Sequence, residues 1–100
     1  MIAFVRTANI NPGKNASAAA FAKEVCAHFK KHYDVELEVL VPVGGNPMRM
    51  AWSTRYKNLA AMEALREKLA GDTAYWGMLE QHAATFQAGS MHDAIWKTAG

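Results

Sequence analysis

Histidine and cysteine are the residues of this sequence best suited to acid–base, nucleophilic or metal chemistry, and the chain holds 4 His and 1 Cys. His82 falls on one apolar helical stripe with Tyr75 and Phe86. Because the pKa of an imidazole lies near neutrality, His82 is a candidate catalytic acid or base. A hydrogen-bonded core histidine would produce the same pattern, so both interpretations stay open.

The other histidines and the cysteine do not indicate a metal site. His28 and His32 lie on one face of an expected helix, but no third ligand accompanies them in the local sequence. Near a helix end, such histidines are more often solvated or capping groups. Cys26 cannot form an internal disulfide, and inside a helical pattern it is expected to be a small buried hydrophobe. Since no signal peptide is apparent at the N-terminus, a cytoplasmic, reducing compartment is predicted.

The aromatic residues indicate where a ligand would bind. The chain holds 3 Trp, 4 Phe and 3 Tyr, more than one core of a 100-residue chain needs. We predict a pocket lined by Phe21, Trp52, Tyr75 and His82, to which Trp76 could add a flat surface. Such a pocket would take a small apolar or aromatic ligand. The alternative is that these side chains only fill the core and a subunit interface.

The hydrophobic period of the sequence changes along the chain, and each change marks a boundary between elements. The expected elements are a strand over 2–7, a helix over 15–32 with Asn15 as its N-cap, strands over 35–41 and 48–53, a helical stripe ending at Gly71-Asp72, a second stripe over 75–86 and a strand over 91–98. This order predicts an α+β, ferredoxin-like βαββαβ fold with a four-stranded antiparallel sheet. No linker is long enough to separate two domains, so residues 1–100 are expected to form a single domain.

The central hairpin determines which side chains share a face of the sheet. A turn at Gly44 and Gly45 would pair Val39 with Met50 and place the apolar side chains of both strands under the helices. The other face is mixed and carries Leu40 among alanines and charged residues. An open face with this apolar content favours docking against a second copy of the chain. We therefore expect a homodimer formed through the open sheet face.

Composition and charge exclude several classes of protein. The chain is 51% hydrophobic and 20% charged, which excludes disorder, and its apolar runs fall far short of the ~20 residues that span a bilayer. The net charge is only +2 and the basic residues are scattered, so the basic patch of a nucleic-acid-binding protein is absent. Neither a nucleic acid nor a membrane is expected as a partner.

Across essentially its whole length the chain resembles a known superfamily. The strand over 48–53 is followed by the helical stretch from Asn58 to Leu65, then by Leu69-Ala70-Gly71-Asp72 and a second short helix. This succession is similar to the dimeric α+β barrel superfamily, which includes antibiotic-biosynthesis-monooxygenase-like and NIPSNAP-like proteins. The stretch over 89–96 is similar to the last strand of NIPSNAP-like members. In that superfamily two sheets pack face to face across a two-fold axis, and small ligands usually sit between sheet and helices.

The resemblance implies a homodimeric small-molecule-binding protein, or a cofactor-independent enzyme of monooxygenase-like or isomerase-like type. It supplies no catalytic set, because Lys68 and Met78 stand where haem-degrading members carry a Trp and a His. Neither haem nor another cofactor is expected. The alternative is a non-catalytic dimerisation domain whose aromatic residues are core. A cavity between Trp52 and the stripe of Tyr75 and His82 would separate these two hypotheses.

Overall fold

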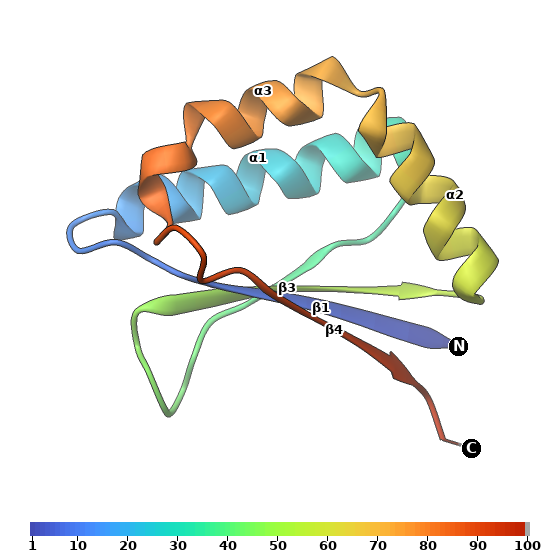
Figure 1. Ribbon diagram of the computed structural model, residues 1–100, viewed down its shortest axis with the longest axis horizontal. Helices are drawn as coiled ribbons and strands as arrows, with labels where there is room; N and C mark the ends of the chain where they lie inside the picture. Colours follow the sequence, from blue (N-terminus) through green and yellow to red (C-terminus); the bar gives the residue numbers. More distant parts are fainter. Residues whose placement is uncertain (100) are drawn as a thin grey trace.

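Strands and helices follow one another in the predicted order. The computed structural model describes residues 1–99. Its elements are β1 (Ile2–Asn9), α1 (Asn15–Tyr33), β2 (Glu38–Leu40), β3 (Arg49–Tyr56), α2 (Leu59–Ala70), α3 (Thr73–Gln81), the 3₁₀ turn η1 (Ala83–Thr85) and β4 (His92–Lys97). The strands form one antiparallel sheet in the order β2-β3-β1-β4, and the helices cover one face of it (Figure 1). The predicted ferredoxin-like fold is confirmed.

Helix α1 is positioned by one apolar stripe. Its buried side chains recur at spacings of three and four and are Ala18, Phe21, Ala22, Val25 and Phe29. The prediction that Asn15 is the N-cap was wrong: Lys14 takes that position, and no side chain caps the helix. The backbone bond from Lys14 to Asn11 closes a turn that leads straight into the helix, so Asn15 is already its first residue.

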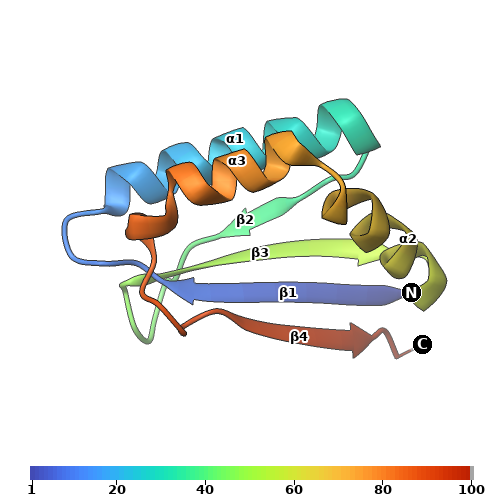
Figure 2. The ribbon, with the colours of Figure 1, turned by 45° about the horizontal axis from the view of Figure 1, so that its top comes forward.

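The second helical region is broken where the sequence predicted. The Asn58 side chain accepts a hydrogen bond from the backbone N–H of Ala61 at 2.9 Å and caps α2. The Asp72 side chain accepts one from Tyr75 at 3.0 Å and caps α3. Because the chain turns at Gly71, α2 rises from the sheet and α3 then lies beside α1 (Figure 2). None of the helices described is long and apolar enough to cross a membrane.

The hairpin of β2 and β3 differs from the prediction by two residues. Val39 lies opposite Trp52, not opposite Met50, and β2 is much shorter than expected. The prediction of a tight turn at Gly44 and Gly45 was wrong, because the carbonyl of Met48 accepts a hydrogen bond from the backbone N–H of Ile10 at 2.8 Å. That bond ties the start of β3 to the end of β1 and leaves a wide loop after β2. A shift of two residues keeps every side chain on its predicted face.

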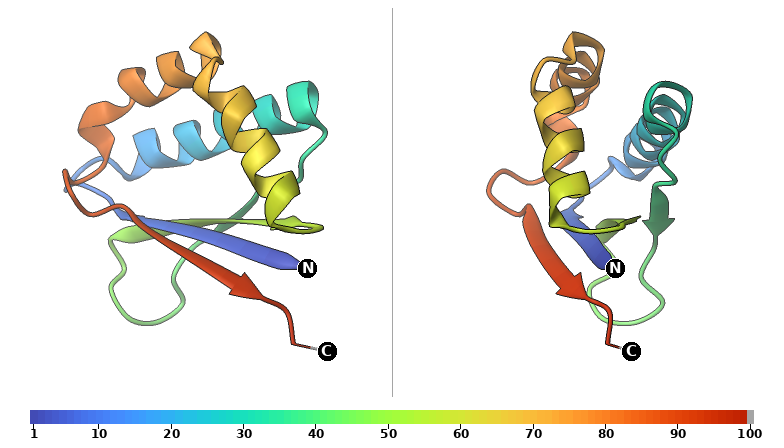
Figure 3. Two further views of the ribbon diagram at one scale, coloured as in Figure 1. Left: turned by 45° about the vertical axis from the view of Figure 1, so that its right-hand side comes forward. Right: turned by 90° about the vertical axis from the view of Figure 1, so that its right-hand side faces the viewer.

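The two faces of the sheet have different surroundings. Arg6 and Ala8 of β1 lie opposite Trp52 and Met50 of β3, so these side chains share the face beneath the helices. No helix of residues 1–99 covers the other face, which Figure 3 shows from the side. On that face Trp96 is 64% exposed. Helix α1 stands above the β2–β3 side of the sheet, and α2 and α3 stand above the β1–β4 side (Figure 3).

Candidate functional site

A cavity of about 640 Å³ lies between the sheet and the helices. Its walls come from β1, β3, all three α-helices and the segment over 86–91 that leads into β4. Most of the lining side chains are apolar or aromatic. The volume falls within the roughly 300–1,000 Å³ of small-molecule sites in proteins. This space is therefore large enough for a ligand and not only for a few water molecules.

All four side chains that the sequence proposed as pocket residues line this one cavity. Phe21 comes from α1, Trp52 from β3 and Tyr75 from α3, while His82 follows directly after α3. Each of them is at most 9% exposed. Trp76 also lines the cavity, although half of its side chain faces solvent. Their part in ligand binding stays a prediction.

Three aromatic rings form one wall of the cavity. Phe21 contacts Trp52 edge to face, with ring centroids 5.9 Å apart, and Phe86 lies 5.4 Å from Phe21 and 5.5 Å from Trp52. Edge-to-face pairs of this kind fix ring orientation as well as burying area. The Trp52 Nε1 atom is buried and has no hydrogen-bond partner among the described residues. Apart from this N–H group, the wall is apolar.

His82 connects the end of α3 to α1. Its Nδ1 lies 3.3 Å from Ser17 Oγ, and its Nε2 lies 3.3 Å from Glu24 Oε2. Ser17 in turn lies 2.6 Å from Thr85 Oγ1. A carboxylate only accepts, so Nε2 carries a hydrogen and Nδ1 of the neutral ring accepts from Ser17. Because both ring nitrogens are engaged, a catalytic proton transfer through His82 would first have to displace one of these partners.

Two arginines on the cavity wall were not singled out from the sequence. Arg6 projects from β1 and Arg66 from α2. The alternation of β1 does place Arg6 on the same face as Phe4, but this pattern cannot tell which face lies beneath the helices. Arg6 donates two hydrogen bonds to Asp93, from Nε at 2.7 Å and from Nη2 at 3.0 Å. The hydrogen bond to Asp93 raises the pKa of Arg6, so the guanidinium stays charged.

Comparison with known proteins gives structural matches alone. No protein-family model and no curated protein matches the sequence. An uncharacterised NIPSNAP domain protein from Burkholderia xenovorans superposes with a TM-score of 0.84 at 17% identity, over 99% of this chain and 95% of that chain. A NIPSNAP family protein of unknown function from Agrobacterium tumefaciens gives 0.83 at 18% identity, over 99% and 88%. A candidate antibiotic biosynthesis monooxygenase from Nitrosomonas europaea gives 0.74 at 14% identity, over 98% of both chains.

The chain has the fold of NIPSNAP and antibiotic biosynthesis monooxygenase-like proteins. The superfamily resemblance of the sequence is thereby confirmed at the level of the fold. Identities this low carry no information on the ligand or the reaction.

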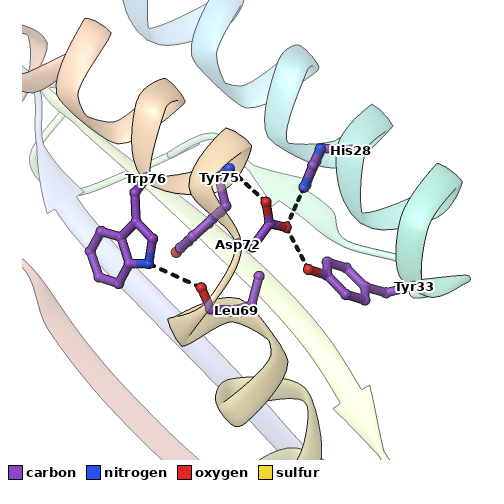
Figure 4. A network of polar contacts seen from close by, with 6 residues as sticks. All are labelled: His28, Tyr33, Leu69, Asp72, Tyr75 and Trp76. Carbon is purple, nitrogen blue, oxygen red and sulfur yellow. Dashed lines mark hydrogen bonds and ion pairs between the residues drawn. The ribbon is translucent and has the colours of Figure 1, made fainter.

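A second polar cluster, which we call the Asp72 network, holds the helices of this NIPSNAP-like fold together (Figure 4). Asp72 Oδ2 accepts hydrogen bonds from His28 Nε2 at 2.7 Å and from the hydroxyl of Tyr33 at 2.5 Å. Its other oxygen caps α3 through the N–H of Tyr75. The Asp72 network therefore ties the C-terminal part of α1 to the start of α3. His28 was expected to be solvated or capping, which was wrong, because Asp72 covers it and leaves its side chain 11% exposed.

The Asp72 network alters the titration of its members. Hydrogen bonds from His28, and then from Tyr33, hold the pKa of the Asp72 carboxyl well below its usual range. The bond to Asp72 raises the pKa of Tyr33 to about 12. Both shifts have the same cause, since the ionised carboxylate is the form that accepts these bonds.

We expect the Asp72 network to make stability dependent on pH in acid. A carboxyl whose pKa is depressed in the folded state stabilises that state above its unfolded pKa of about 3.9, and this contribution is lost as the pH falls through the folded value. The free energy of unfolding of the wild type should thus fall more steeply below about pH 4 than that of Asp72→Asn. Urea titrations followed by circular dichroism at several pH values measure both slopes. Parallel slopes for the two proteins would contradict the prediction.

Proposed function

We propose that this protein binds a small apolar or aromatic molecule in the cavity between its sheet and its helices. The observation that carries the proposal is the cavity of about 640 Å³, with aromatic side chains on its walls. Such a surface removes water from an apolar ligand on several sides. The alternative of a purely structural domain, with the aromatic residues as its core, gives no account of a space this large.

The residues that line the cavity support ligand binding better than they support catalysis. His82 is the candidate acid or base, and both of its ring nitrogens are already paired with side chains of α1. A monooxygenase-like activity is supported only by the names of structural neighbours that are 10% and 14% identical, and none of these names supports an isomerase-like activity. We therefore place ligand binding first and a cofactor-independent reaction second.

We also propose that the protein is a homodimer joined through its open sheet face. Leu40 and Trp96 lie on this face and are 42% and 64% exposed. Apolar side chains of this size on a face without helices are the usual mark of a contact surface. We further propose a cytoplasmic location, with which the free thiol of Cys26 is compatible.

The cavity is tested by filling it. Leu79 of α3 lines the cavity and is half-buried, so Leu79→Trp should place an indole in the space of the ligand. With the neutral fluorescent probe N-phenyl-1-naphthylamine, we expect wild-type protein to enhance the emission and Leu79→Trp to bind at least about tenfold more weakly. Leu59→Trp is the matched control, because Leu59 is 53% exposed and does not line the cavity. Equal affinity in all three proteins, or no binding by the wild type, would refute the proposal.

A further inference from the structure

The charge on the cavity wall is unbalanced. Arg6 and Arg66 are its only lysine or arginine side chains, and no Asp or Glu of residues 1–99 lines it. The remaining wall is apolar or aromatic apart from a few neutral polar groups. The carboxylates that pair with these arginines, Asp93 and Glu63, both lie outside the lining, so only the cations face the space. A ligand group of negative charge would therefore be attracted to this wall.

Arg6 is held in place as a preformed donor. Its fork of two hydrogen bonds to Asp93 fixes the plane of the guanidinium, and Cζ lies 5.6 Å from the centre of the Phe4 ring. The bonds engage Nε and Nη2, which leaves the hydrogens of Nη1 free of Asp93. Asp93 lies directly opposite Arg6 on β4, at the edge of the sheet. The side chain of Arg6 therefore keeps its position before any ligand arrives.

Arg66 forms a weaker ion pair than Arg6 does. Its nearest carboxylate is Glu63, at 3.6 Å, and both side chains are about 60% exposed. An ion pair of this length and exposure contributes little, so Arg66 can turn to another anion at small cost. Because Arg66 lines the cavity and is also exposed, it stands where the cavity meets solvent. Arg6 chiefly, and Arg66 in addition, lower the pKa of Asp93, so both cations act on the same part of the wall.

From these contacts we infer that the ligand is an anionic amphiphile, with an apolar or aromatic body in the cavity and a carboxylate between Arg6 and Arg66. The inference rests on the proposed function, because it requires that the cavity bind a ligand. A guanidinium can donate two parallel hydrogen bonds to a carboxylate, since both groups are planar forks. Asp93 neutralises Arg6, whereas Arg66 has only its long, exposed ion pair with Glu63, so the charge of Arg66 is the one that a ligand can take up.

A matched pair of ligands tests the inference. 2-Naphthoate and 2-naphthamide share one aromatic body and differ in charge. By isothermal titration calorimetry we expect the wild type to bind the naphthoate about tenfold more tightly, with the difference shrinking as salt is added. Arg66→Gln should remove most of this preference, because it should weaken the binding of the naphthoate far more than that of the amide. Lys68→Gln is the control, because it removes the same charge from the same helix at a position that does not line the cavity.

Removing the charge of Asp93 should strengthen the binding of naphthoate, whereas removing that of Arg66 should weaken it. Asp93→Asn can still accept a hydrogen bond from Arg6 but no longer neutralises it, so naphthoate should bind a few-fold more tightly while naphthamide is unchanged. Equal wild-type affinity for both compounds would overturn the inference and leave the proposed cavity function intact. If Arg66→Gln weakened both compounds alike, the charge would not be the reason and the inference would also fail. Failure of both compounds and of the neutral probe to bind would refute the proposed function itself.

Discussion

Replacing Asp72 with alanine is expected to lower the free energy of unfolding by about 3 kcal/mol. The substitution removes the cap of α3 and leaves His28 and Tyr33 without the carboxylate that both contact. Loss of a cap costs about 1 kcal/mol, and loss of each of the two part-buried hydrogen bonds costs about 1 kcal/mol. For a chain of this length the melting temperature should fall by roughly 10–20 °C. Thermal and urea denaturation followed by circular dichroism measure both quantities.

Two further variants separate the parts of this effect. Tyr33→Phe removes one hydrogen bond and should cost only about 1 kcal/mol, while Asp72→Asn keeps an oxygen for the cap and should lie between the extremes. In the double variant Tyr33→Phe with Asp72→Ala, the two losses should sum to more than the measured total, because both break the same bond. A loss below about 1 kcal/mol for Asp72→Ala would show that the Asp72 network does not hold the helices together.

Replacing Trp96 with glutamate is expected to weaken association of the proposed homodimer by about 100-fold or more. Trp96 is the largest exposed apolar side chain on the open sheet face, and in a two-fold interface each substitution occurs twice. Truncating one buried aromatic anchor costs 2 kcal/mol or more by itself, and a buried carboxylate adds the cost of removing its hydration. The dimer should therefore become a monomer at micromolar concentration.

Sedimentation velocity over a range of protein concentrations measures this change. Leu59→Glu is the matched control, because Leu59 is also an exposed apolar residue but lies on α2, above the opposite face of the sheet. It should sediment as the wild type does. A wild type that is monomeric at micromolar concentration, or a Trp96→Glu protein that stays dimeric, would rule out this face as the interface. Circular dichroism shows whether the variant remains folded. We expect that it does, because the Trp96 side chain is exposed.

The Asp72 network and the contacts of His82 lie at the two ends of α3, which forms one side of the cavity. Asp72 fixes one end of α3 against α1, and His82 fixes the other end through Ser17 and Glu24. Between these two attachments α3 runs beside α1 (Figure 2), and its residues Tyr75, Trp76 and Leu79 line the cavity. The helix is thus tied to α1 at both of its ends.

What the sequence determined by itself is the order of the elements and which side chains of one element share a face. The apolar stripe around Phe21, the alternation of Met50 and Trp52 and the break before Asp72 are local patterns, and period and turn chemistry act over a few residues. Even the hairpin, whose register was wrong by two residues, kept its faces, because side chains of a strand repeat every second residue.

The tertiary structure alone decided the contacts between distant positions. His28 meets Asp72 across 44 residues of sequence, and Arg6 meets Asp93 across 87. No local pattern encodes such a pair, since it depends on how strands order in the sheet and how far the helices stand above it. The cavity is of the same kind: the sequence supplied its four aromatic and histidine wall residues, but whether they fill the space or enclose it depends on the distance between two layers.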